Sequence, residues 1–110
     1  MSDSDIMIAA KEFAETIKKS ETYQKYLYQR EKIKRQPALY DKVNEFRQRN
    51  FDLQNEVDSE ELFDRMETFE KEYEKFRENP LVDDFLRAEL AFCRMMQDIN
   101  VFLTAEIDFE

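Results

Sequence analysis

The sequence predicts an all-helical fold, and three observations lead to this class. The chain of 110 residues contains no glycine, whereas a β-rich chain of this length needs several tight turns, most of which place glycine at positive φ. Apolar residues recur at alternating steps of four and three along most of the chain, which is the period of a helix. The two prolines, Pro37 and Pro80, stand where helices would begin rather than inside them. We therefore expect an all-α helical bundle of about five helices in a single domain, residues 1–110.

Two helices are expected before Pro37. The first has an apolar side at steps of four and three, formed by Ile6, Ala10, Phe13 and Ile17. Asp3 or Ser4 is expected to cap its N-terminus. Ser20 provides a second cap ahead of the next stripe, which consists of Tyr23, Tyr26, Leu27 and Ile33. The sequence leaves open whether the chain breaks at Lys19 and Ser20.

The third helix is expected to begin at Pro37 and to end near Asn55. Its apolar stripe has one polar member and consists of Leu39, Val43, Phe46, Asn50, Leu53 and Val57. Asn50 either fixes the register or oligomeric state of the packed helices or lies at the edge of the bundle, and both interpretations stay open. Glu45 and Arg49 lie four residues apart, so we expect an ion pair between them.

A fourth helix is expected to follow Asp58, because Asp58 and Glu61 have the spacing of a capping box. Its apolar stripe continues without a break through Leu62, Met66, Phe69, Tyr73 and Phe76. Ion pairs at four-residue spacing are expected between Glu61 and Arg65 and between Glu67 and Lys71. Such pairs each contribute only about 0.2 to 0.5 kcal/mol, so we expect the apolar stripe to hold this helix in place.

Asn79 and Pro80 are interpreted as the cap and first residue of a long C-terminal helix that extends to about Glu106. At roughly 1.5 Å per residue this helix would be about 40 Å long, which is more than a small bundle needs. Its apolar positions occupy most of its circumference, so most of its surface must be covered. We therefore expect self-association, as a homodimer or homotetramer. The predicted interface consists of Phe92, Met95, Met96, Ile99, Phe102 and Leu103.

The residue types that carry most catalytic chemistry are missing. There is no histidine, and Cys93 is the only cysteine, which removes serine–histidine and cysteine–histidine nucleophiles and the usual zinc sites. We expect no catalytic residue, cofactor or metal, with Cys93 as an inert buried thiol. Aromatic side chains at core spacing are expected to pack the interior, namely Phe46, Phe69, Tyr73, Phe76, Phe85 and Phe92. Acidic side chains are expected on a solvated face, namely Glu70, Glu72, Glu74 and Glu78.

The formal charge of −9 disfavours binding to nucleic acid or to an anionic membrane. The chain has no run of about 18 apolar residues, as a membrane span requires, and its amino terminus lacks the pattern of a signal peptide. We therefore expect a cytoplasmic protein without a membrane partner.

One basic stretch, from Lys18 to Arg35, is interleaved with tyrosines. Our first interpretation is a solvated helix face, because the net charge repels nucleic acid. The second is a docking patch for an acidic partner, formed by Lys25, Arg30, Lys32, Lys34 and Arg35. The alternative function is an RNA-binding module that uses this stretch.

Several short patterns occur together and in order along the chain. They are Ser20-Glu21-Thr22-Tyr23-Gln24-Lys25-Tyr26, Pro37-Ala38-Leu39, Asn44-Glu45-Phe46-Arg47, Asn50-Phe51-Asp52-Leu53-Gln54, Asn79-Pro80-Leu81-Val82 and Arg87-Ala88-Glu89. In these patterns nearly the whole chain resembles the YlbF/YmcA family of small helical bacterial proteins, also called control-of-competence regulators. The resemblance implies a non-enzymatic helical protein that forms dimers or higher oligomers and acts through protein partners. Two members of that family join a third protein in a complex that helps ribonuclease Y mature messenger RNA, which affects competence, sporulation and biofilm formation.

The resemblance implies structural rather than catalytic roles for the matching positions. These positions are Tyr23, Pro37, Phe46, Arg47, Gln54, Asn79 and Pro80. Members of the ribonuclease complex have cysteines near the carboxyl end that help ligate iron–sulfur clusters, whereas this chain has no cysteine after Cys93. The expected function is that of a regulatory or adaptor protein. Its expected partners are itself, other family members and ribonuclease Y, or a different partner if it is a paralogue outside that complex.

Overall fold

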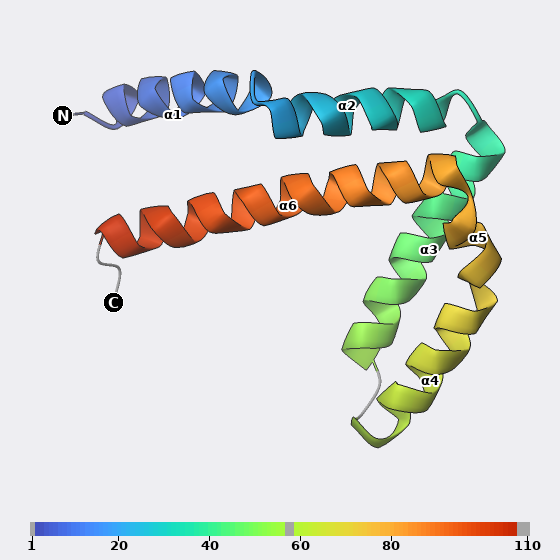
Figure 1. The fold of residues 1–110 in the computed structure, drawn as a ribbon. Coiled ribbons are helices and arrows are strands. Elements are labelled where there is room, and N and C mark those ends of the chain that lie inside the picture. The colour runs from blue at the N-terminus through green and yellow to red at the C-terminus, as the bar shows by residue number, and fades with distance from the viewer. Residues whose placement is uncertain (1, 57–58, 108–110) are drawn as a thin grey trace. The chain divides into compact units, whose positions relative to one another are not determined.

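A computed structural model describes residues 2–56 and 59–107 of the chain. In this part of the chain there are six helices and no strand (Figure 1). The helices are α1 (Asp3–Lys18), α2 (Glu21–Lys34), α3 (Pro37–Glu56), α4 (Ser59–Glu72), α5 (Glu74–Glu78) and α6 (Pro80–Ile107). The predicted all-α class and the long C-terminal helix are confirmed.

Side-chain caps begin α1, α2 and α6, and the cap of α1 differs from the prediction. At α1 the cap is Ser2, not Asp3 or Ser4: the Asp5 backbone N–H donates to Ser2 Oγ at 3.3 Å, and the Ser2 N–H donates to the Asp5 carboxylate at 3.1 Å. This reciprocal capping box satisfies two backbone donors at once, which explains the choice. Ser20 caps α2 as predicted, by accepting from the Tyr23 N–H at 3.1 Å.

Pro37 and Pro80 open α3 and α6 as predicted. The Asn79 side chain accepts a hydrogen bond from the Leu81 N–H at 3.0 Å, so it caps α6. The chain does break at Lys19 and Ser20, which the sequence left open. Asp58 and Val57, which entered the predictions for the third and fourth helices, lie outside the described residues.

The structure divides the predicted fourth helix in two at Tyr73, whose φ is −103° and ψ is 8°. The four-residue hydrogen bonds continue across this point, from Tyr73 N–H to the Phe69 carbonyl at 3.1 Å and from Arg77 N–H to the Tyr73 carbonyl at 3.0 Å. The interruption between α4 and α5 is therefore a local change of backbone angle that leaves the helical path in place. The sequence missed it because Tyr73 fits the apolar stripe.

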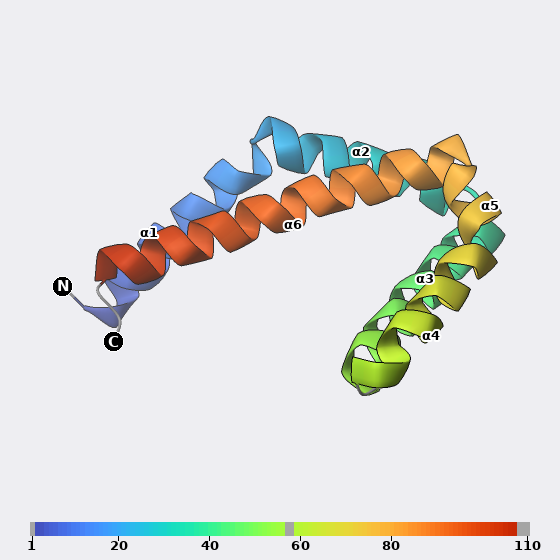
Figure 2. The same ribbon diagram turned by 60° about the horizontal axis from the view of Figure 1, so that its bottom comes forward.

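The chain forms two compact units, the first from residues 1–29 and 87–110 and the second from residues 30–86. In the second unit, α3 and α4 contact each other and run in opposite directions, as both views show (Figures 1 and 2). All the buried hydrophobic side chains of the described residues belong to this unit. They are Ile33, Val43, Phe69, Tyr73, Phe76, Val82 and Phe85.

The first unit has a different character. None of its described residues is buried, and it carries eleven of the thirteen large hydrophobic side chains that are exposed in the described chain. In both views α1 and the second half of α6 run in opposite directions (Figures 1 and 2). Within residues 2–56 and 59–107, no helix combines the length and apolar character of a membrane span.

Candidate functional site

The six residues of the predicted interface all lie on α6 in the first unit. The structure separates them into two groups. Phe92, Met95 and Ile99 are half-buried within the unit. Phe102 is 62% exposed, Leu103 42% and Met96 39%. The prediction therefore joined residues that pack inside the unit with residues that face solvent.

The packing of Phe92 explains this division. Its ring stacks on Tyr26, with centroids 5.2 Å apart and planes at 22°, and it meets the edge of Tyr23 at 5.2 Å. Offset and edge-to-face aromatic pairs of this kind hold two helices together. Phe92 thus attaches α6 to α2 inside the unit. Among the described residues, no ring of this kind packs on the exposed apolar residues that follow it on α6.

The residues of the predicted basic docking patch are divided between the two units. Lys25 lies in the first unit and is paired with Glu21 at 2.9 Å; its hydrogen bond and charge lower the pKa of the Glu21 carboxyl. Arg30 lies in the second unit and contacts Glu31 at 3.6 Å, and Lys34 Nζ lies 5.7 Å from the centroid of the Tyr40 ring. Lys32 and Arg35 are exposed there as well. The docking patch and the RNA-binding alternative stay predictions.

A polar network connects α3 to the junction of α4 and α5 within the second unit. Arg49 donates two hydrogen bonds to the Glu72 carboxylate, at 2.6 and 2.9 Å, and a third to the Tyr73 hydroxyl at 3.0 Å. The Tyr73 hydroxyl in turn donates to Glu45 Oε1 at 2.9 Å. The two parallel bonds between a guanidinium and a carboxylate form a bidentate pair, which fixes geometry better than a single contact.

The hydrogen bonds of this network change the pKa values of three of its residues. The hydrogen bonds to Glu72 and Tyr73 raise the pKa of Arg49. The hydrogen bond from Arg49 lowers the pKa of Glu72. Burial is the main reason that the pKa of Tyr73 is raised, and its hydrogen bond to Glu45 acts in the same direction. At neutral pH the network therefore contains a charged pair and a neutral phenol.

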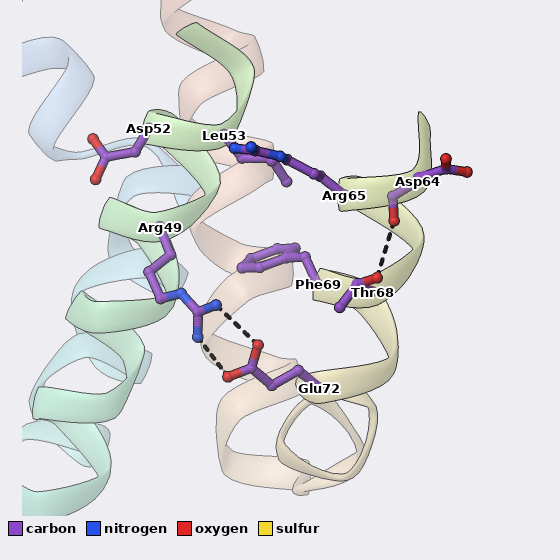
Figure 3. Close-up of a pocket in the computed structure, with 8 residues that line it drawn as sticks. All are labelled: Arg49, Asp52, Leu53, Asp64, Arg65, Thr68, Phe69 and Glu72. Atoms are coloured by element: carbon purple, nitrogen blue, oxygen red, sulfur yellow. Dashed lines mark hydrogen bonds and ion pairs between the residues drawn. The ribbon is translucent and has the colours of Figure 1, made fainter. Parts of the chain in front are cut away.

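The bidentate pair borders an open groove of about 440 Å³ between α3 and α4, which we call the ionic groove (Figure 3). The buried ring of Phe69 lies beside the pair, and the Arg49 guanidinium carbon is 5.9 Å from its centroid. The groove is lined by Arg49, Asp52, Leu53, Asp64, Arg65, Thr68, Phe69 and Glu72. Arg49 already donates to Glu72 and Tyr73, so its guanidinium connects α3 to the α4–α5 junction and is not open to bind another anion.

The sequence missed the partners in this network. Glu45 and Arg49 were expected to pair along α3, and that prediction was wrong, because Arg49 binds Glu72 while Glu45 accepts from Tyr73. The sequence-local ion pairs of α4 are confirmed, with 3.4 Å between Glu61 and Arg65 and 3.4 Å between Glu67 and Lys71. A cross-helix partner leaves no signal in sequence spacing, since the packing of the two helices creates it.

Two further predictions concern Cys93 and the aromatic residues. Cys93 is exposed on α6, so the expectation of a buried thiol was wrong. Its neighbours Phe92 and Met95 are half-buried, but apolar neighbours in the sequence do not place a side chain on the packed side of the helix. The expected aromatic core is confirmed in the second unit. Phe46 stacks on Phe69 with centroids 5.2 Å apart and meets Tyr73 edge-on at 5.1 Å. Phe85 is 1% exposed.

Comparison with known proteins gives the family. Residues 6–108 match the family model described as control of competence regulator ComK, YlbF/YmcA. The chain belongs to the YlbF/YmcA family. A relative from Caldicellulosiruptor bescii, named only as a UPF0342 protein, is 23% identical over 107 residues, which cover 92% of this chain and 87% of the relative. No solved structure matches. The predicted resemblance to the YlbF/YmcA family is therefore confirmed, and it extends over nearly the whole chain.

Proposed function

We propose that this YlbF/YmcA family member is a non-enzymatic cytoplasmic regulator that acts by binding proteins, first of all a second copy of itself. The observation that carries the proposal is the composition of the first unit, which has no buried residue and eleven exposed large hydrophobic side chains among its described residues. Because apolar surface of this extent is unfavourable in water, a binding partner is the natural cover. The family's description as a competence regulator supports the regulatory part.

The exposed surface of α6 has the properties expected of a contact with a second copy of this chain. Met96, Leu103 and Ile107 recur at steps of seven and four, so they lie along one side of the helix, which we call the α6 apolar face. Between residues 95 and 105 only Asp98 is charged. Two such faces can approach with little repulsion between like charges, as a symmetric dimer requires.

The first helix also carries exposed apolar residues. No residue of α1 is buried, and Ile6, Met7 and Ile8 are each more than half exposed. Phe13, on the predicted apolar side of this helix, is 42% exposed. The exposed apolar residues of α1 and α6 therefore provide surface that a homodimer or homotetramer would bury. In such an assembly α1 would gain the packing that it lacks in a single chain.

The test is the native mass of a variant with Met96→Glu and Leu103→Glu, measured by light scattering. We expect the mass to fall toward that of one chain, because two charges would be forced into an apolar contact. Phe92 and Ile99 are unsuitable positions, because they are half-buried inside the unit. Phe51→Glu with Phe63→Glu, at exposed positions on α3 and α4, is the matched control and should keep the native mass. A monomeric wild-type protein, or an unchanged mass for the α6 variant, would contradict the proposal.

The family resemblance in the sequence also implies a set of partners. We propose that it acts as an adaptor for other family members and for ribonuclease Y, and so influences competence, sporulation and biofilm formation. Capture of the tagged protein from its host, with nuclease present, should recover these proteins if the contact is between proteins and does not pass through RNA. Recovery of its own chain alone would support self-association and contradict the adaptor role.

A further inference from the structure

Two phenylalanines of the second unit face solvent although the rest of its aromatic residues pack inward. Phe51 on α3 is 62% exposed and Phe63 on α4 is 75% exposed. Neither belongs to the apolar stripe of its helix, so neither is needed for the packing of α3 against α4. The stripe partners Phe46 and Phe69 are half-buried and buried, respectively. An exposed aromatic ring outside the core stripe on each of two neighbouring helices calls for an explanation other than folding.

Helix geometry places these two rings at the same level and on the same side of the α3–α4 pair. Phe46 stacks on Phe69, which fixes the register of the antiparallel helices. Phe51 follows Phe46 by five residues and Phe63 precedes Phe69 by six, so both lie about 8 Å along the helix axes from the stacked rings. At about 100° per residue, each is rotated by about 120 to 140° from the contact, in the same sense when each helix is viewed from its own N-terminus. Because the helices are antiparallel, this places both rings toward one side of the pair, each turned away from the other helix.

The same arithmetic separates these rings from the ionic groove. Arg49 and Glu72 each follow their stacked phenylalanine by three residues, a rotation of about 60° in the opposite sense. Half-buried Met66 precedes Phe69 by three residues and so lies on the side of the exposed rings. We call the surface formed by Phe51, Phe63 and Met66 the aromatic face. It is distinct from the groove and from the α6 apolar face.

The surroundings of the aromatic face are acidic on its α4 edge. Glu60, Glu67 and Glu70 are three residues before Phe63, four after it and seven after it, so they share its side of the helix. Over its whole length α4 has six carboxylates and two cationic side chains. The neighbours of Phe51 at three- and four-residue spacing are mainly amides, namely Gln48, Gln54 and Asn55, together with Arg47.

Lys71 pairs with Glu67 at 3.4 Å, so this edge contains one cation among its carboxylates. On the α3 side, the Arg47 side chain makes contacts elsewhere in the unit. It hydrogen-bonds to the Asn44 side chain, and its guanidinium carbon lies 5.7 Å from the centroid of the buried Phe85 ring. The aromatic face therefore combines two exposed rings with a carboxylate rim. This combination complements a helix that has apolar residues on one side and lysines or arginines beside them.

We propose that the aromatic face binds a basic amphipathic helix of a different protein. A second copy of this chain is disfavoured there, because two acidic rims would meet, and the chain has a formal charge of −9. Protein interfaces usually have aromatic anchor residues at the centre and charged residues at the rim. This inference rests on the proposed regulatory function and adds the chemistry of the partner and the place where it binds.

The test uses a labelled synthetic helix with leucines on one side and lysines on the other, titrated with the full chain and followed by fluorescence anisotropy. The matched probe has glutamates in place of the lysines. We expect the lysine probe to bind and the glutamate probe not to bind. Phe51→Ser with Phe63→Ser should weaken binding by about tenfold or more, as removal of anchor residues does.

Two variants make this result specific. Glu67→Gln with Glu70→Gln keeps both rings and should weaken binding and its dependence on salt, because rim charges act through long-range attraction. Val101→Ser with Phe102→Ser removes apolar side chains of similar exposure on α6, 68% and 62%, and should leave probe binding unchanged. Equal binding of both probes, or undiminished binding by the Phe51→Ser and Phe63→Ser variant, would overturn the inference.

The native mass of each variant separates this inference from the proposed self-association. Loss of probe binding at normal native mass supports the aromatic face as a second, separate surface. Failure of the lysine probe to bind an oligomeric wild-type protein contradicts only the inference about the partner. A monomeric wild-type protein that binds the lysine probe contradicts only self-association through α6.

Discussion

The two units of this protein use apolar residues in opposite ways. In the second unit, residues 30–86, apolar side chains from α2 to α6 are buried against each other, and among its described residues only Phe51 and Phe63 of the large ones are exposed. In the first unit, the described parts of residues 1–29 and 87–110 bury none completely. Hydrophobic content therefore says little about stability by itself. Within one chain it makes a closed core in one unit and an apolar surface exposed to solvent in the other.

The largest difference between the units should appear when one phenylalanine of each is truncated. Phe85→Ala, at 1% exposure, should lower the free energy of unfolding by about 3 to 5 kcal/mol, because it leaves a cavity in the core. Phe102→Ala, at 62% exposure, should change it by less than about 0.5 kcal/mol in a single chain. Urea unfolding at low protein concentration measures both. Similar losses for the two variants would mean that the first unit has a core of its own.

A smaller effect is expected from the hydroxyl of Tyr73, which joins α3 to the junction of α4 and α5. Tyr73→Phe keeps the ring and removes the bonds with Arg49 and Glu45, so we expect a loss of about 1 kcal/mol in the free energy of unfolding. Tyr40→Phe, which keeps its ring near Lys34 Nζ, is the control and should change stability by less than about 0.5 kcal/mol. Equal effects would show that the network does not contribute to the second unit's stability.

The smallest effect should be the dependence of stability on pH that comes from Glu72. Its pKa is lowered in the folded protein by the hydrogen bond from Arg49. The stabilisation is therefore complete above the unfolded value of about 4.3 and is lost as the pH falls through the lower folded value. Glu72→Gln should be less stable than the wild type at neutral pH, and the difference should shrink on acidification below about pH 4.3.

A double variant tests the assignment of this pH effect to one pair. Arg49→Met should remove the same pH-dependent component, and adding Glu72→Gln to it should remove nothing more. Unfolding curves recorded at neutral and acidic pH give the required comparison. A difference between wild type and Glu72→Gln that stays constant with pH would contradict the shift.

The sequence could predict helix boundaries wherever a local interaction sets them. Pro37, Pro80, Ser20 and Asn79 act on backbone groups within four residues, so their roles could be derived without knowledge of the fold. The break at Tyr73 could not be predicted, because the backbone angles there depart from the helix while the side chain still fits the stripe. The predicted cap of α1, Asp3 or Ser4, was wrong by only one or two residues, since Ser2 is the cap.

The functional surfaces were harder to predict. A stripe on α6 shows which residues are apolar, but it does not show that Phe92 meets Tyr26 while Leu103 faces solvent. Burial depends on tertiary contacts, which also explains the wrong prediction for Cys93. The aromatic face did have a signal in the sequence, since Phe51 and Phe63 stand outside their stripes, and large apolar residues in such positions are candidates for binding.

The division of the chain between the units also affects the order in which they can form during synthesis. The second unit comes from one continuous segment, so all its buried residues have been made once Phe85 leaves the ribosome. The first unit joins α1 and most of α2 to the later part of α6, and the ring of Phe92 that meets Tyr23 and Tyr26 is made after the whole second unit. During that interval Tyr23 and Tyr26 lack Phe92, and the apolar residues of α1 are exposed. Such a nascent helix is a natural target for chaperones, which bind transiently exposed apolar segments.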